Sequence, residues 1–362
     1  MKIAILGTRG IPNNHGGFEQ FAEYLSVYLS NKGHEVYVYN SHSHPYQEKV
    51  WNGVQIIHKY DPEDKIGTPG QFIYDFNCIL DSRKRKFDVI LQLGYTSSSV
   101  WGWMLPSRSI VVTNMDGLEW KRSKYSKPVQ KFLKYAERLA IKTSDYFVSD
   151  SIGIEKYLTD KYEVNSEYIA YGANIFSSPD ESVLSTYDVS KHEYNMLIAR
   201  LEPENNIETI LDGVAMDRNN STFLVIGKHE TEFGEYLKNK LKNYSNIRFI
   251  GGIYNIAHLD NLRYFSNLYF HGHSVGGTNP SLLEAMASSA LIIANDNLFN
   301  KSVLEENAFY FKTKEDVLNL LNLKKLEHIT FIEKNTEKIK SEFSWDIINS
   351  KYEVFLKKCL NA

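Results

Sequence analysis

The chain has 362 residues, of which 43% are hydrophobic and 23% charged, a composition typical of globular proteins and a length that suits two domains. The formal net charge of −3 argues against nucleic-acid binding through bulk positive charge, and the two cysteines, Cys78 and Cys359, exclude a disulfide framework and a cysteine zinc site. Because no apolar run reaches the length of a membrane span, we expect a soluble or at most peripheral protein in the reducing cytoplasm.

The first half of the chain alternates short β-branched runs with helix-period segments, a pattern typical of parallel sheets with crossover helices. The loop after the first run is long and ends in Gly16 and Gly17, at the start of a predicted helix. It does not have the G-x-G-x-x-G form of a dinucleotide-binding turn. It suits a loop that reaches across a cleft to a ligand, and the alternative is a surface loop whose glycines only form turns. We predict strands at residues 2–6, 35–39, 88–93, 110–113 and 146–149.

The second half repeats this alternation after a polar, turn-rich stretch at residues 177–182. We place the linker near residue 180, which gives an N-terminal domain at residues 1–180 and a C-terminal domain at residues 181–345. The predicted fold class is α/β, with two doubly wound, Rossmann-like domains whose strands point their carboxyl ends at a central cleft. Strands are predicted at residues 195–199, 222–226, 248–250, 268–271, 291–294 and 309–311.

Residues 276–287 are predicted to form a glycine loop that runs into a helix. Thr278 or Asn279 suits the N-cap and Pro280 the first helical position, and the bare N–H groups of a helix start bind anions. Glu284, one turn later, is placed to accept hydrogen bonds from ribose hydroxyls. The alternative is an ordinary capped helix with a solvated glutamate. The predicted ligand-binding residues of this segment are Gly276, Gly277, Thr278, Asn279, Pro280, Ser281 and Glu284.

Two cations follow predicted strands of the second half. Arg200 comes directly after the strand at 195–199, and Lys228 follows Gly227 at the end of the strand at 222–226. Side chains at the carboxyl ends of parallel strands face the ligand crevice, where a guanidinium suits phosphate oxygens. Taken alone, each cation is a weak signal, since an arginine or lysine at a strand end is more often a solvated cap. Together with the helix start, they predict a diphosphate site.

These residues resemble those of a family 4 retaining glycosyltransferase with the two-domain GT-B architecture, and the resemblance covers nearly the entire chain. Two segments, 7–12 and 271–280, are similar to a narrower bacterial subgroup of capsule and O-antigen assembly, which includes transferases that add L-rhamnose from dTDP-rhamnose. The resemblance implies that a last helix, at residues 346–362, crosses back to the N-terminal domain. It rests on the segments 16–19, 199–206, 225–228 and 271–286.

The chain departs from the family pattern at two positions. The family has a pair of glutamates eight residues apart around the sugar-binding loop, and here Gly276 takes the first position while Glu284 keeps the second. The family also has a lysine five residues after the strand-end arginine, where this chain has Asn205. We interpret both changes as an altered donor geometry rather than a loss of activity.

Departure of a nucleoside diphosphate from a sugar leaves negative charge on phosphate, which fixed cations and N–H donors stabilise. The chain has no D-x-D sequence of the kind that holds a divalent ion in other glycosyltransferases, so we predict catalysis without metal or cofactor, carried by Arg200 and Lys228. Asp116, in a loop after a first-half strand, is predicted to orient the acceptor hydroxyl or help remove its proton. The alternative is an aspartate that only forms a turn before Gly117.

The segment from residue 119 to residue 142 has six more basic than acidic residues, with aromatic residues between them. Such a face suits an anionic bilayer that carries a lipid-diphosphate-linked saccharide as acceptor, and the alternative is an ordinary solvated helix face. No nucleic-acid-binding module accompanies the charge. We therefore expect a cytoplasmic protein that is peripheral on the inner face of the plasma membrane through Lys121, Arg122, Lys124, Lys127, Lys131 and Lys134.

The predicted function is retaining transfer of a sugar, L-rhamnose from dTDP-rhamnose first and a hexose from a UDP-hexose second, onto a lipid-linked polysaccharide precursor. Two alternatives remain open: a nucleotide-sugar epimerase, which the missing carboxylate at Gly276 disfavours, and a non-catalytic nucleotide-sugar sensor or assembly protein. A Rossmann dehydrogenase is disfavoured because the chain lacks G-x-G-x-x-G with a following ribose-binding acid.

Overall fold

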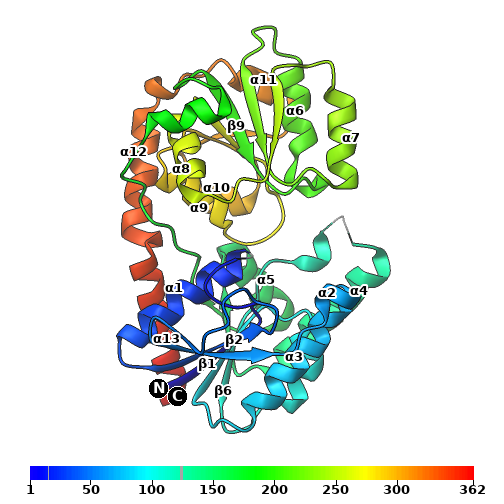
Figure 1. Cartoon of the computed structure of the whole chain (residues 1–362), viewed down its shortest axis with the longest axis vertical. Helices are drawn as coiled ribbons and strands as arrows, with labels where there is room; N and C mark the ends of the chain where they lie inside the picture. The colour runs from blue at the N-terminus through cyan, green and yellow to red at the C-terminus, as the bar shows by residue number, and fades with distance from the viewer. Residues whose placement is uncertain (15, 123–124) are drawn as a thin grey trace. The chain divides into compact units, whose positions relative to one another are not determined.

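The structure is a computed structural model that describes residues 1–14, 16–122 and 125–362 (Figure 1). The chain forms two compact domains, which are described separately. The N-terminal domain consists of Met1–Trp120, Tyr125–Tyr171 and Trp345–Ala362, and the C-terminal domain consists of Gly172–Ser344 together with residues 121 and 122.

The N-terminal domain contains an eight-stranded sheet in the order β3-β4-β2-β1-β5-β6-β7-β8. All neighbouring strands are parallel except β3 and β4, which form an antiparallel pair. The central strands are buried on both faces, as their continuous apolar sequences predict. The strands are β1 (Lys2–Leu6), β2 (Glu35–Ser41), β3 (Val50–Trp51), β4 (Val54–Lys59), β5 (Val89–Leu93), β6 (Ile110–Asn114), β7 (Tyr146–Ser149) and β8 (Glu167–Tyr168).

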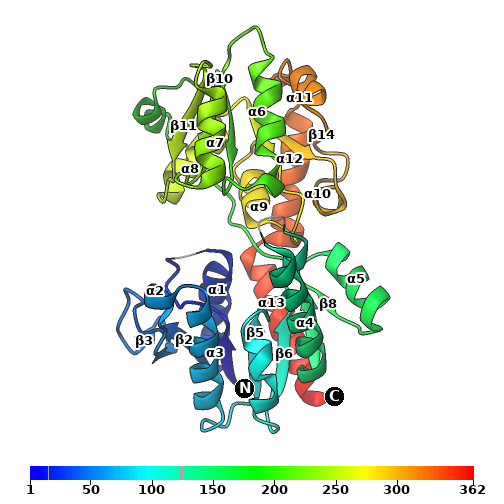
Figure 2. The same ribbon diagram turned by 90° about the vertical axis from the view of Figure 1, so that its right-hand side faces the viewer.

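Helices cover both faces of this sheet (Figures 1 and 2). On one face α3 and α4 pack around the 3-10 helix η1, and on the other α1 packs against α13, the last helix of the chain. Phe21 of α1 and Tyr352 of α13 place their ring centroids 4.8 Å apart in that contact. The helices are α1 (Gly17–Asn31), α2 (Glu63–Ile66), α3 (Pro69–Ser82), η1 (Ser98–Met104), η2 (Glu119–Lys121), α4 (Lys127–Thr143), α5 (Ile152–Tyr162) and α13 (Trp345–Asn361).

The C-terminal domain contains a six-stranded parallel sheet in the order β11-β10-β9-β12-β13-β14. Its core lies between this sheet and helices such as α6, which buries Ile207, Ile210 and Leu211. The strands are β9 (Tyr194–Ile198), β10 (Thr222–Ile226), β11 (Ile247–Gly251), β12 (Leu268–His271), β13 (Ile292–Asn295) and β14 (Phe309–Phe311).

The helices of this domain form two groups, with α6, α7 and α11 in one and α8, α9 and α12 in the other. They are η3 (Glu181–Tyr187), η4 (Pro203–Asn205), α6 (Ile207–Ala215), α7 (Glu232–Leu241), α8 (Ile256–Phe265), α9 (Pro280–Ala287), α10 (Leu298–Leu304), α11 (Lys314–Leu320), η5 (Lys325–Glu327), α12 (Ile329–Lys338) and the π-helical turn η6 (Ile339–Phe343).

The two-domain α/β class and the eleven predicted strands are confirmed, with strand ends that differ by no more than two residues. Sequence reasoning missed β3, β4 and β8, of which β3 and β8 have only two residues each. The main body of the C-terminal domain begins at Gly172, before the predicted linker near residue 180. The reason is that residues 172–180 are bonded to the C-terminal domain, where the Phe176 amide donates to the Ala287 carbonyl and the Asp180 amide to Asn261.

Candidate active site

The C-terminal sheet reverses its strand order between β9 and β12. From β9 the chain first adds β10 and β11 on one side, and then returns to add β12, β13 and β14 on the other. In open parallel sheets ligands bind beyond the carboxyl ends of the strands at such a switch point. The loops that follow β9, β10 and β12 therefore frame the candidate site of this domain.

Arg200 and Lys228 stand at this edge on adjacent strands. The parallel register pairs Ile198 with Ile226, and each cation lies two residues beyond its member of the pair. Both side chains are exposed. Gly227 permits the close approach of the two strand ends, since a Cβ there would lie 1.9 Å from the Ala199 carbonyl oxygen. The predicted pair of neighbouring cations is thus present in the fold.

Hydrogen bonds join the loops after β9 and β12. The Asn206 side chain donates to the Gly272 carbonyl at 2.8 Å, and the Ser274 hydroxyl donates to the Glu204 carbonyl at 2.7 Å. A Cβ on Gly272 would lie 2.1 Å from the Asn205 carbonyl oxygen, so only glycine fits there. These contacts fix the backbone next to Arg200.

The loop from Gly276 enters α9 as the sequence predicts. Asn279 is the N-cap, with its side-chain oxygen accepting from the Ser281 amide at 2.9 Å, and Pro280 is the first helical residue. Gly276 has a φ of +120° and nothing within 4 Å of a Cβ built on it, so its backbone conformation, and not a crowded neighbour, requires glycine. Thr278 is buried and Gly277 is half-buried. The amides of Ser281, Leu282 and Leu283 all donate to Asn279, so this is a capped helix start, and anion binding there stays a prediction.

Ser281 was predicted to bind the ligand, but its hydroxyl is occupied within the domain. It lies 2.9 Å from the Tyr269 hydroxyl and accepts from Arg263 at 3.4 Å. Its amide is bonded to the Asn279 cap. Any contribution of Ser281 to anion binding therefore comes through the position it gives to the helix start.

Glu284 is held by an arginine that sequence reasoning missed. Arg263 on α8 is 1% exposed, and its Nη2 donates to Glu284 Oε2 at 2.6 Å while its Nη1 donates to Asp260 at 2.9 Å. Burial lowers the pKa of Arg263, but the charges of Glu284, Tyr269 and Asp260 outweigh this effect and raise it. The Glu284 side chain is 30% exposed, so it is a fixed carboxylate and not the freely solvated glutamate of the alternative interpretation.

Two histidines lie at the carboxyl end of β12, with their rings stacked 4.4 Å apart. Both ring nitrogens of His271 and Nδ1 of His273 are buried and have no hydrogen-bond partner among the described residues. Burial, followed by the charges of Arg122 and Arg200, lowers the pKa of His273 to about 4. Both imidazoles are therefore neutral at physiological pH.

In the N-terminal domain Asp116 follows β6 in a left-handed conformation, with a φ of +48°. Its amide donates to the Asn114 side chain at 3.0 Å, as in the turn that the alternative interpretation predicts. Directly after the neighbouring strand β7, Asp150 is 2% exposed, and burial together with the charge of Asp116 raises its pKa. Sequence reasoning missed Asp150, because only the sheet places it beside the Asp116 loop.

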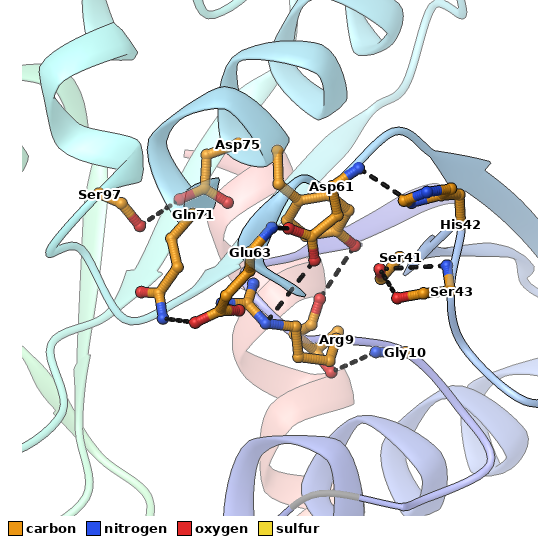
Figure 3. A network of polar contacts seen from close by, with 12 residues as sticks. Arg9, Gly10, Ser41, His42, Ser43, Asp61, Glu63, Gln71, Asp75 and Ser97 are labelled. Atoms are coloured by element: carbon orange, nitrogen blue, oxygen red, sulfur yellow. Dashed lines mark hydrogen bonds and ion pairs between the residues drawn. The ribbon is translucent and has the colours of Figure 1, made fainter. Parts of the chain in front are cut away.

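The loop after β1 is tied to its own domain along the part that precedes residue 13. The Arg9 amide donates to Glu19 at 2.8 Å, and the Ile11 amide donates to the Asn40 side chain at 3.1 Å. The Arg9 guanidinium is paired with Glu63 and lies 3.9 Å from Asp61 (Figure 3). This segment is therefore anchored, and reach across a cleft stays a prediction for the rest of the loop.

The Arg9 network continues to Asp75, which accepts from the Ser97 hydroxyl at 2.5 Å (Figure 3). Asp75 is 6% exposed, and burial raises its pKa to about 6 despite the Ser97 bond and the Arg9 charge. The network lies at the carboxyl edge of the N-terminal sheet, where the loops after β1, β4 and β5 meet.

Gly16 is the N-cap of α1, and Gly17 is its first helical residue. A Cβ on Gly16 would meet nothing closer than Glu19 Oε2 at 3.8 Å, and its φ of 174° is ordinary extended backbone. Neither crowding nor strain within the domain requires glycine at residue 16. The prediction that these glycines let a ligand approach remains consistent with the geometry and stays a prediction.

The basic residues of segment 119–142 do not all lie on one face in the structure. On α4 the side chains of Lys127, Lys131 and Lys134 are exposed, and the helix's single acid, Glu137, is 1% exposed and accepts from Tyr157, Lys161 and Trp120. Arg122 is directed elsewhere, toward Glu204 of the C-terminal domain. Lys121 is exposed, and Lys124 lies outside the described residues.

Among the described residues, no helix has the length and apolar character that crossing a bilayer requires.

Two family models match parts of the chain. Residues 107–174 match a domain of unknown function, DUF1972, and residues 189–338 match Glycosyl transferases group 1. The second match contains Arg200, Lys228, the helix start at Asn279 and Glu284. Comparison with curated proteins gives no match.

Solved structures of glycosyltransferases share the fold. Sucrose-phosphate synthase from Thermosynechococcus elongatus has a TM-score of 0.78 at 15% identity, over 99% of this chain and 98% of its own. Anabaena HepE in complex with UDP has a TM-score of 0.74 at 15% identity, over 99% and 100%. WaaG, a glycosyltransferase of lipopolysaccharide biosynthesis, has a TM-score of 0.70 at 12% identity, over 98% and 99%.

The two parallel α/β domains thus define a GT-B fold. Within the C-terminal domain, residues 189–338 are similar to the glycosyl transferases group 1.

Proposed function

We propose that the protein is a retaining glycosyltransferase that moves a sugar from a nucleoside diphosphate to a saccharide acceptor. One observation carries this proposal: Arg200 and Lys228 stand at the same edge of adjacent strands, within the domain that matches the group 1 transferases and contains the capped start of α9. A positive edge and a helix N-terminus form a binding site for a diphosphate.

The chemistry follows from the charge that develops when the sugar leaves. Cleavage of the bond between the anomeric carbon and the diphosphate places negative charge on phosphate, and preorganised cations stabilise it without further rearrangement. Arg200 and Lys228 would supply this stabilisation without a metal ion or cofactor. Asp116 would orient the acceptor hydroxyl, whose proton passes to the departing phosphate oxygen in a front-side reaction.

The proposed donor is a nucleoside diphosphate sugar, with dTDP-rhamnose as the first candidate. A nucleoside diphosphate sugar is supported by the HepE structures, which hold UDP, UDP with glucose, and UDP-glucose. Within that class, the sequence resemblance favours dTDP-rhamnose and places a UDP-hexose second. Glu284, held by Arg263 and partly exposed, would accept hydrogen bonds from the ribose.

A lipid-linked acceptor at an anionic bilayer is the proposed setting of the reaction. The exposed face of α4 carries basic charge and no acid, and Tyr135 on the same helix is 56% exposed. Lysines and an amphipathic aromatic ring suit the charged interface of a membrane. The face used would be that of Lys127, Lys131 and Lys134, without Arg122.

A donor panel tests the function. The protein is heated with dTDP-rhamnose, UDP-glucose and other nucleotide sugars, and a ligand at 100 times its Kd should add about 2.7 kcal/mol to the free energy of unfolding. Candidate acceptors are then added and release of nucleoside diphosphate is measured. Turnover that needs both substrates supports the transferase. Binding without turnover would indicate a sensor or assembly protein, and conversion of the donor alone would indicate an epimerase.

Vesicle sedimentation tests the membrane setting. Binding to vesicles with anionic phospholipid should fall as salt rises, and replacement of Lys127, Lys131 and Lys134 by glutamine should weaken it. Equal binding to neutral and anionic vesicles would contradict this part of the proposal and leave the transferase reaction unaffected.

A further inference from the structure

We propose that Arg122 is a phosphate-binding residue of the donor site, supplied to the C-terminal domain by the segment that follows β6. This inference rests on the proposed function, which it deepens by naming a third cation for the diphosphate. In sequence, Arg122 is 78 positions before Arg200 and belongs to the basic segment, so nothing local links it to a nucleotide. The fold makes the link, because residues 121 and 122 pack with the C-terminal domain.

Arg122 lies within ion-pair distance of Glu204. Its Nη1 lies 4.0 Å from Glu204 Oε1, and the two side chains are 23% and 4% exposed. The Glu204 carbonyl in turn accepts from the Ser274 hydroxyl at 2.7 Å. Arg122 therefore lies where the loops after β9 and β12 are joined, which is the switch point of the sheet.

Arg122 and Arg200 act on a common neighbour. The charges of both guanidiniums, after burial, lower the pKa of His273, which follows β12. Both guanidiniums therefore lie within electrostatic range of His273. Because His273 is neutral at physiological pH, it adds no charge that would repel a third cation.

A diphosphate site requires cations. Arg122, Arg200 and Lys228 are positive, and Glu204, the neighbour of Arg122, is negative. The diphosphate of a nucleotide sugar carries two negative charges. The loop after β9 provides only Arg200, since the side chain of Asn205 is neutral and donates to the Arg200 carbonyl at 2.8 Å. Arg122 supplies a further positive charge from another part of the chain.

Arginine suits this role for a geometric reason. A guanidinium has five N–H donors in a planar fork, so it can keep its contact with Glu204 and donate to a phosphate oxygen at the same time. A lysine at this position would retain the charge and lose the double contact. The Arg122→Lys variant should therefore bind a diphosphate better than Arg122→Gln and less well than the unchanged protein.

Calorimetric titration of the full chain with UDP and dTDP, and with uridine and thymidine, tests the proposal. Arg122→Gln should weaken binding of the diphosphates by about 10- to 100-fold, as expected for the loss of a hydrogen bond to a charged group. Binding of the nucleosides, which have no phosphate, should not change. The matched control is Arg218→Gln, an exposed arginine between α6 and β10 at the opposite edge of the same sheet.

The outcomes separate this inference from the proposed function. If Arg200→Gln weakens binding of UDP or dTDP while Arg122→Gln binds like the unchanged protein, the role of Arg122 is overturned and the function stands. An equal loss for nucleosides and diphosphates would also overturn it, because the effect would not depend on phosphate. If the unchanged protein binds neither UDP nor dTDP, the proposed function falls and the inference with it.

Discussion

Arg263 Nη2 lies 2.6 Å from Glu284 Oε2, and this contact joins a buried guanidinium on α8 to the predicted ribose-binding carboxylate on α9. Arg263 also bonds Asp260 at 2.9 Å, and Asp260 accepts from the Ser288 hydroxyl at 3.1 Å. The middle of the short helix α9 and the residue that follows it are thereby tied to α8. The carboxylate of Glu284 keeps one orientation before any ligand binds, which lowers the entropy that binding would cost.

The first prediction concerns the stability of this pair. Arg263→Met should lower the free energy of unfolding by about 3–5 kcal/mol, because it leaves Asp260 and Glu284 without their shared cation. Urea unfolding measures the loss. The control is Lys240→Met, which breaks an exposed pairing with Glu208 and Asp212 and should cost less than about 1 kcal/mol. Similar losses in the two variants would show that burial of Arg263 does not strengthen the contact.

The second prediction concerns ribose recognition by Glu284. Glu284→Gln should weaken UDP binding by about tenfold, the loss of one hydrogen bond to a charged group. The same substitution should have little effect on the binding of a 2′,3′-dideoxy analogue of UDP, which lacks the hydroxyls from which the carboxylate would accept hydrogen bonds. Calorimetric titration of the unchanged protein and of Glu284→Gln with each of the two nucleotides measures the coupling between the carboxylate and the ribose hydroxyls. A loss of equal size for both nucleotides would place Glu284 away from the ribose.

The third prediction concerns the leaving group. Arg200→Ala should lower kcat/KM by about 10²- to 10³-fold, an effect on the order of 3 kcal/mol like that of a lost oxyanion-hole donor. Steady-state rates with the best donor measure it, and Arg218→Ala serves as the control because that arginine is exposed at the other edge of the sheet. A tenfold loss or less on Arg200→Ala would contradict a role in stabilising the departing diphosphate.

The fourth prediction concerns the pH dependence of stability in the Arg9 network. Burial raises the pKa of Asp75 from 3.8 to about 6, so the folded protein holds this proton more tightly than the unfolded chain does. Its contribution to stability is complete below pH 3.8 and is lost as pH rises to 6. Asp75→Asn keeps an acceptor for Ser97 and removes the charge, so at pH 8 the variant should be more stable by up to about 3 kcal/mol.

Thermal unfolding between pH 4 and pH 8 checks this sign, and the advantage of Asp75→Asn should shrink toward the acid end. Asp81 provides the opposite case: burial would raise its pKa, but hydrogen bonds from Arg85, Lys59 and Tyr39 outweigh burial and lower it. Asp81→Asn should therefore destabilise the protein throughout this pH range, because the effect is lost only below pH 3.8. Parallel pH profiles for the two variants would refute the prediction.

The sequence allowed the local parts of the site to be predicted because their signals lie within a few residues. Asn279 and Pro280 specify the start of α9 through capping and a fixed backbone angle, and the structure confirms both positions. Arg200 and Lys228 were placed correctly at strand ends, since a strand and its following residue are read from one short segment. The boundary near residue 180 was displaced because the bonds of Phe176 and Asp180 reach across the sequence.

By itself, the sequence determined the class of fold, eleven of the strands and the start of α9, because hydrophobic period and capping act over a few neighbouring residues. Only the tertiary structure decided which side chains meet. Arg263 reaches Glu284 across 21 positions, Asp150 lies beside the Asp116 loop, and Arg122 approaches Glu204 from the first half of the chain. Charges pair across such separations because the sheet order brings distant loops together, and no local pattern in the sequence contains that order.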